Sequence, residues 1–123
     1  MRLLGCVLLL VLTGHAWGQI TAKDVRDLEA GCQRGDGFSC GALGVMYKYG
    51  EGVKLDKFKA VELFAKACEL RHGQGCRNWG VMYSKGEGVR LDKQRALELF
   101  GKACDLKEEN GCYEYAELKN QGL

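Results

Sequence analysis

The chain has 123 residues, enough for one domain, and carries 18 Lys and Arg residues against 16 Asp and Glu residues, a formal net charge of +2. Because the charges nearly balance and the basic residues form no run, we expect no nucleic-acid partner. Seven cysteines and 18 glycines occur together with no proline, which excludes collagen-like and proline-rich chains. The odd number of cysteines is the first feature to explain.

Residues 1–18 have the pattern of a secretory signal peptide. Arg2 precedes an apolar run over 3–12, and Ala16 and Gly18 are the small residues expected just before a cleavage site. The run is shorter than the roughly 20 residues that span a bilayer, so we predict no stable membrane insertion. Cleavage after Gly18 removes one cysteine and leaves six in residues 19–123. The sequence therefore predicts an exported protein, periplasmic or secreted, in a compartment where disulfides persist.

Two other readings of this segment are weaker. The sequence 3–6, Leu-Leu-Gly-Cys, resembles a lipobox, but most of the hydrophobic residues follow Cys6 instead of preceding it. A mitochondrial targeting sequence would be amphipathic and rich in arginine, which residues 1–18 are not. We therefore treat 19–123 as one repeat domain.

A period of 36 residues runs through this domain. Cysteines recur every 36 residues in two sets, at 32, 68 and 104 and at 40, 76 and 112. Residues 37–72 align with residues 73–108 without a gap, and 21 of 36 positions are identical. A repeat of this length is typical of a solenoid built from helix pairs.

In chain order, the predicted helices cover 21–33, 39–49, a segment after Asp56, 75–85, a segment after Asp92, and 110–121. Asp56 and Asp92 are predicted N-caps because apolar side chains at helical spacing follow each of them. Gly44 and Gly80 lie inside helices, where glycine costs about 1 kcal/mol relative to alanine, so we expect close backbone contact with the next helix. The Gly-x-Gly sequences at 50–52 and 86–88 are expected to end helices and turn the chain.

These elements predict an all-α fold, a right-handed α/α solenoid of three disulfide-linked helix pairs. Each Cys-x7-Cys segment connects the end of one helix to the start of the next. One pairing scheme joins Cys32 to Cys40, Cys68 to Cys76, and Cys104 to Cys112. The alternative joins 40 to 68 and 76 to 104 and leaves two cysteines unpaired, so parity favours the first. We predict no metal, because Cys-x2-Cys spacing is absent and residues 19–123 contain one histidine.

Two motifs in each repeat carry a family resemblance. The first copy has Leu43-Gly44-x-x-Tyr47-x-x-Gly50-x-Gly52, then Lys59-Ala60-x-x-Leu63-Phe64-x-Lys66-Ala67-Cys68, and the second has Trp79 in place of Leu43. They resemble the Sel1-like repeat family of the tetratricopeptide-like class, and its secreted cysteine-rich branch from Helicobacter. The resemblance implies a solenoid adaptor for peptides or proteins and, for some members, weak β-lactam binding or hydrolysis.

The sequence contains no recognised catalytic constellation. A serine β-lactamase needs a Ser-x-x-Lys motif, and neither Ser39 nor Ser84, the only serines, has a lysine three residues later. Phosphate-binding glycine motifs are absent too. We predict no catalytic residue and no cofactor, and a β-lactamase-like hydrolase is an alternative that depends on the resemblance alone.

The resemblance also places the first helix of each repeat along a concave groove. If Leu43, Gly44 and Tyr47 pack inward, the opposite face carries residues that differ between the copies. We predict that this groove binds a protein, a peptide or a peptidoglycan (cell-wall) fragment through aromatic stacking and carboxylate pairing. The candidate contact residues are Phe38, Lys48, Tyr49, Arg77, Lys85 and Tyr113.

Overall fold

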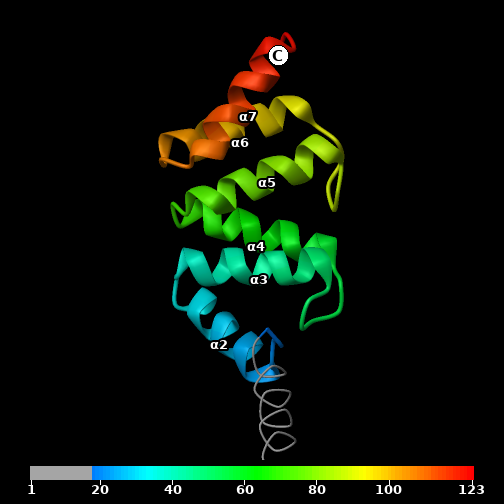
Figure 1. Cartoon of the computed structure of the whole chain (residues 1–123), viewed down its shortest axis with the longest axis vertical. Helices are drawn as coiled ribbons and strands as arrows, with labels where there is room; N and C mark the ends of the chain where they lie inside the picture. The colour runs from blue at the N-terminus through cyan, green and yellow to red at the C-terminus, as the bar shows by residue number, and fades with distance from the viewer. Residues whose placement is uncertain (1–17) are drawn as a thin grey trace, which may run out of the picture.

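The computed structural model describes residues 18–123, so the predicted signal peptide lies outside the described residues except for Gly18, and so does Cys6. The described residues form helices and no strand. The helices are α2 (Ala22–Gln33), α3 (Gly37–Tyr49), α4 (Lys57–Glu69), α5 (Gly73–Lys85), α6 (Lys93–Asp105) and α7 (Glu109–Asn120). They stack from α2 at one end of an elongated molecule to α7 at the other (Figure 1). The predicted all-α solenoid is confirmed.

The stack alternates two kinds of helix. We call α3, α5 and α7 the A helices and α2, α4 and α6 the B helices. The helices α3 and α5 each pack against the B helices that precede and follow them, and α7 packs against α6. In addition, α3 contacts α5 and α5 contacts α7. The A helices therefore lie side by side and form a continuous layer along the stack.

Aspartates begin the B helices α4 and α6, as predicted. The Asp56 side chain accepts a hydrogen bond from the backbone N–H of Lys59 at 3.0 Å, and Asp92 does the same for Arg95 at 3.0 Å. The A helices α3 and α5 begin two residues earlier than predicted, because residues 36 and 72 are extended and serve as their N-caps. The turn from a B helix to the next A helix is thus shorter than the sequence indicated.

Glycines end α3 and α5. Gly50 and Gly86 have φ angles of 70° and 67°, a left-handed conformation that glycine adopts without steric cost. The chain then folds back, and the backbone N–H groups of Asp56 and Asp92 donate to the carbonyls of Tyr47 and Tyr83, each at 2.9 Å. The predicted turns after the Gly-x-Gly sequences are therefore present.

The interior glycines bring the A and B helices of one repeat together. A Cβ atom on Gly44 would lie 2.6 Å from the ring of Phe64, and one on Gly80 would lie 2.8 Å from the ring of Phe100. Phe64 is completely buried and Phe100 is 3% exposed. The close contact predicted for these glycines is confirmed, and its partner is the phenylalanine of the following helix.

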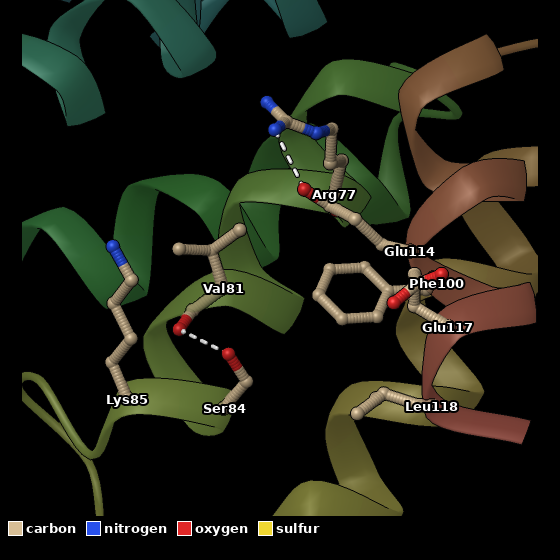
Figure 2. A pocket seen from close by; sticks show the side chains of 8 residues that line it. All are labelled: Arg77, Val81, Ser84, Lys85, Phe100, Glu114, Glu117 and Leu118. Atoms are coloured by element: carbon tan, nitrogen blue, oxygen red, sulfur yellow. Dashed lines mark hydrogen bonds and ion pairs between the residues drawn. The ribbon is translucent and has the colours of Figure 1, made fainter. Parts of the chain in front are cut away.

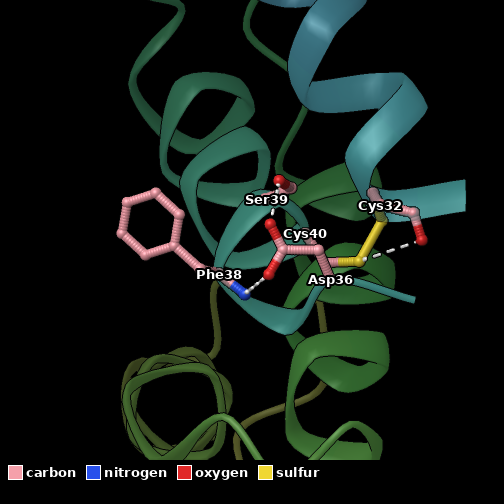
Figure 3. The surroundings of a disulfide bond; sticks show 5 residues. All are labelled: Cys32, Asp36, Phe38, Ser39 and Cys40. Atoms are coloured by element: carbon pink, nitrogen blue, oxygen red, sulfur yellow. Dashed lines mark hydrogen bonds between the residues drawn. A yellow bond between two sulfur atoms is a disulfide. The ribbon is translucent and has the colours of Figure 1, made fainter. Parts of the chain in front are cut away.

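Three disulfides join each B helix to the next A helix. The bonds are Cys32–Cys40, Cys68–Cys76 and Cys104–Cys112, with Cα–Cα distances of 4.6, 4.4 and 4.5 Å. They use all the described cysteines and correspond to the first of the two pairing schemes. Figure 3 shows the bond between α2 and α3, with the Phe38 side chain directed away from it.

Candidate functional site

Several of the residues that differ between the copies lie on one face of the A helices. Three cavities follow this face, and we call the surface that they line the A-helix groove. The first cavity, about 260 Å³ in volume, lies between α5, α6 and α7. Figure 2 shows the Phe100 ring near the centre of the view, with Leu118 below it, Arg77 above and Lys85 at the left. Its lining residues are Arg77, Val81, Ser84, Lys85, Phe100, Glu114, Glu117 and Leu118.

An ion pair crosses the wall of this cavity. The Arg77 guanidinium donates to the Glu114 carboxylate at 2.7 Å, and both side chains are only about one-quarter exposed, 26% and 24%. Arg77 Nε and the second carboxylate oxygen of Glu114 are buried without a hydrogen-bond partner in the protein. Because buried polar atoms of this kind are normally paired, the pair retains one donor and one acceptor for water or a ligand.

The second cavity is positively charged. It has a volume of about 290 Å³ and is lined by Lys48, Tyr49, Leu55, Lys57, Lys85 and Glu87. Glu87 is 3.6 Å from Lys57 and balances that charge, while Lys48 Nζ lies 5.2 Å from the centre of the Tyr49 ring, a cation–π distance. Lys85 lines both cavities, so the two form one continuous surface.

The third cavity lies where α3 and α5 begin. It measures about 60 Å³ and is lined by Phe38, Gly41, Ala42, Val45, His72, Gln74 and Asn78. The Phe38 ring meets the His72 ring edge-to-face, with centroids 6.1 Å apart, and is still 63% exposed. This end of the groove therefore presents aromatic rings and no carboxylate, lysine or arginine side chain.

The structure brings five of the six predicted contact residues to this groove. Phe38, Lys48, Tyr49, Arg77 and Lys85 line the three cavities. Tyr113 is 68% exposed but lines none of them. The predicted role of Arg77 as a free cation for a ligand carboxylate needs revision, because its guanidinium is already paired with Glu114.

Sequence reasoning missed the partners that lie on other helices. Glu114, Phe100 and Leu118 complete the first cavity, and Lys57 and Glu87 complete the second. Arg77 and Glu114 are 37 residues apart, one more than the repeat, which is the spacing of side chains that face each other on adjacent A helices. That spacing was the one signal in the sequence from which the ion pair could have been found.

The two serines have no catalytic surroundings. Ser39 is 7% exposed and its hydroxyl donates to the Asp36 carboxylate at 2.6 Å (Figure 3). This hydrogen bond is the main reason that the pKa of Asp36 lies below its ordinary value of 3.8. The Ser84 hydroxyl donates to the Val81 carbonyl at 3.3 Å. The β-lactamase-like alternative is not favoured, and residues 18–123 contain no group of three or more metal-ligating side chains.

The alternating helices, the close glycine contacts and the continuous A-helix layer define an α/α solenoid of the tetratricopeptide-like class. The Sel1 repeat model matches residues 38–72 and 73–108, and the chain belongs to the Sel1 repeat family. Sel1 repeats generally mediate contacts between proteins. Between residues 18 and 123, no helix is long and apolar enough to cross a membrane.

Solved structures share this fold. The chain is similar to Helicobacter pylori cysteine rich protein B, with 36% identity over 73% of this chain and 68% of that one, and a TM-score of 0.71. It is similar to a protective antigen of uropathogenic Escherichia coli that displays an SLR fold, with 31% identity over 83% of this chain and 22% of the antigen, and a TM-score of 0.78.

A Sel1 repeat protein from Oxalobacter formigenes shares the fold at 20% identity and a TM-score of 0.75, over 80% of this chain and 41% of that one. No curated protein matches the sequence. The chain therefore spans about two thirds of the Helicobacter protein and less than half of the other two.

Proposed function

We propose that this Sel1-repeat protein is an exported adaptor that binds an extended segment of a partner protein in the A-helix groove. The observation that supports this proposal is that two cavities on the face of the A helices share Lys85 and form one continuous surface. The lining of the three cavities includes residues that differ between the repeats, whereas the glycines and phenylalanines at the contacts between helices are identical.

The side chains of the groove indicate how a segment would be held. Phe38 and Tyr49 are 63% and 58% exposed and offer aromatic surfaces at the two ends of α3. Lys48 and Lys85 line the positively charged cavity, where they would pair with acidic side chains of the segment. An extended peptide with an apolar or aromatic residue near Phe38 and acidic residues near Lys48 fits this arrangement better than a neutral glycan fragment does.

The proposed export rests on two features. Disulfides persist in oxidising compartments, and all six described cysteines are paired. The signal-peptide pattern in residues 1–18 supports the same conclusion. Intact-mass analysis of protein from the periplasm and culture medium tests it: we expect a mature chain that begins at Gln19 with no free thiol. A cytoplasmic, reduced chain that retains residues 1–18 would contradict it.

The groove is tested with two exposed phenylalanines. Phe38 lies in the groove, and Phe58, which is 74% exposed, lies on the B helix α4 and lines none of the cavities described above. We would select binders from a library of extended peptides and measure their affinity for wild type, Phe38→Ser and Phe58→Ser. We expect Phe38→Ser to weaken binding at least about fivefold, since a buried aromatic contact contributes about 1 kcal/mol or more, and Phe58→Ser to leave it unchanged. Equal effects of the two substitutions would contradict the proposed site.

A further inference from the structure

A fourth cavity lies apart from the A-helix groove, between α2, α3 and α4. It has a volume of about 290 Å³, and none of its lining residues borders the other three cavities. The lining residues are Glu29, Cys32, Gln33, Leu43, Tyr47, Lys59, Glu62, Leu63 and Lys66. Its floor is apolar, and lysines and glutamates surround it.

The second repeat has a larger, aromatic side chain at the position that corresponds to Leu43 of this cavity. Position 43 corresponds to position 79, where the side chain is an indole. Trp79 packs on Cys68 and Leu99, the counterparts of Cys32 and Leu63 in the cavity. Its ring lies 6.1 Å from that of Tyr83, the counterpart of Tyr47.

A cation covers the indole in the second repeat. The Arg95 guanidinium lies 5.2 Å from the centre of the Trp79 ring, a cation–π contact, and Glu98 holds it there through an ion pair of 2.8 Å. The first repeat has the same pair of charges, because Lys59 and Glu62 occupy the corresponding positions, with a separation of 3.8 Å. The cavity thus has the walls and the cation of an aromatic site, with the smaller Leu43 in place of the ring.

We propose that the cavity between α2, α3 and α4 binds a planar aromatic group in the place that corresponds to the Trp79 indole. Leu43 and Leu63 contact the face of the ring, Tyr47 contacts its edge, and the Lys59 ammonium lies over its π system. The ring belongs either to a small aromatic molecule or to an aromatic side chain of a bound protein. This proposal does not depend on ligand binding in the A-helix groove.

The test is an NMR titration of the oxidised protein with indole, which follows backbone amide shifts. A ring of this size in such a site is expected to bind with a dissociation constant on the order of 1 mM. We expect saturable shifts at Leu43, Tyr47 and Leu63, and their loss in Leu43→Trp, whose own indole fills the cavity. Phe58→Ser, on α4 but outside the lining of every cavity described above, is the matched control and should bind indole as wild type does.

Further arms distinguish the sources of the ring. A capped Gly-Trp-Gly peptide that binds as indole does identifies a protein side chain as the ligand, whereas binding of indole alone identifies a small molecule. Capped Gly-Leu-Gly should not bind. Lys59→Gln, a surface change that keeps the fold, should weaken indole binding about two- to fivefold through loss of the cation–π contact. It also tests the site if Leu43→Trp does not fold.

The proposal is overturned if indole and the tryptophan peptide both fail to cause saturable shifts near Leu43. It is also overturned if a folded Leu43→Trp protein binds indole as wild type does, if Gly-Leu-Gly binds as tightly as the tryptophan peptide, or if Lys59→Gln leaves the affinity unchanged.

Discussion

Repeats 37–72 and 73–108 have the same arrangement of helices and share 21 of 36 residues. They differ at three places: a packing position, a helix cap and a turn. The indole of Trp79 occupies a place where the first repeat has Leu43 and a cavity. Asp36 caps α3 with its side chain, whereas His72, at the corresponding position, forms no such hydrogen bond to α5. The left-handed residue before each of these caps is Gly35 in one case and Arg71 in the other.

The two repeats have identical residues at several contacts between helices and different residues at parts of the surface. The identical residues include those where helices touch, such as Gly44 with Phe64 and Gly80 with Phe100. The residues that differ include residues of the A-helix groove, of the cavity at Leu43, of the turns and of the B helices. A repeat can therefore vary its binding surfaces without changing how its helices pack. Four predictions test this distinction between packing and surface, and their expected effects decrease from the first to the fourth.

The largest expected effect comes from removing a disulfide in the middle of the stack. Cys68 and Cys76 are completely buried, whereas Cys104 and Cys112 are partly exposed. Replacing the first pair by alanines should lower the free energy of unfolding by about 3 kcal/mol, from loop entropy and lost packing. Replacing the second pair should cost about 2 kcal/mol because less packing is lost. Urea unfolding measures both, and a larger loss at 104–112 would contradict the comparison.

The second prediction concerns two glycines inside helices of the second repeat. Gly80→Ala should lower the free energy of unfolding by roughly 2 kcal/mol, because its Cβ would overlap the buried Phe100 ring. Gly101→Ala should instead raise it by about 0.5 kcal/mol through higher helix propensity. The nearest atoms to a Cβ at 101 belong to Tyr115, 3.3 Å away, and this side chain is 38% exposed and can move. Thermal unfolding of both variants gives the signs, and equal signs would be inconsistent with this account.

The third prediction exchanges residues in the turns that precede the A helices. Arg71 and Lys107 have φ angles of 64° and 70°, a conformation that costs residues with a side chain about 1–2 kcal/mol. Gly35 has a φ angle of 89° at the corresponding position. Arg71→Gly should therefore raise the free energy of unfolding by about 0.5–1 kcal/mol, after allowing for the entropy of glycine in the unfolded chain. Gly35→Arg is the reciprocal control and should lower it; an unchanged midpoint in both would refute the interpretation.

The smallest expected effect is the pH dependence of the cap on α3. The pKa of Asp36 is lower in the folded chain than its ordinary value of 3.8, mainly through the Ser39 hydroxyl. Its ionised form thus stabilises the fold above about pH 4, and this contribution is lost as the pH falls through the folded pKa. Asp36→Asn keeps the cap but does not titrate, so its melting temperature should fall less steeply below pH 4 than that of wild type.

His72→Asn, at the corresponding cap of α5, is the control for that experiment. This variant keeps the Ser39 hydrogen bond, the main cause of the lowered pKa of Asp36, and removes only the smaller contribution of the His72 charge. Its melting temperature should therefore fall below pH 4 almost as steeply as that of wild type. If the melting temperatures of Asp36→Asn and wild type fall equally steeply below pH 4, the Asp36 contact does not contribute to the loss of stability in acid.

Most of the fold could be predicted because its signals are local or periodic. Asp56 and Asp92 mark helix starts by their own side chains, and Gly50 and Gly86 mark helix ends by their conformation. The starts of α3 and α5 were placed two residues late: the Asp36 cap of α3 was missed, and His72, at the corresponding position of α5, is not a typical cap. The sequence predicted which face of the A helices carries the contact residues. It did not predict which of these residues line a common cavity. Whether Tyr113 lines a cavity and whether Arg77 is free both depend on neighbouring helices.

The amino-acid sequence alone was enough to predict the repeat, the order of the helices, the caps of α4 and α6 and the favoured disulfide pairing, since each of these depends on residues within one period. Which side chains meet across repeats depends on the tertiary structure. It pairs Arg77 with Glu114, joins two cavities of the A-helix groove through Lys85, and leaves a cavity at Leu43 where its counterpart Trp79 is packed. The physical reason is that these contacts depend on how far each helix pair is rotated and shifted against the next, which no local pattern encodes.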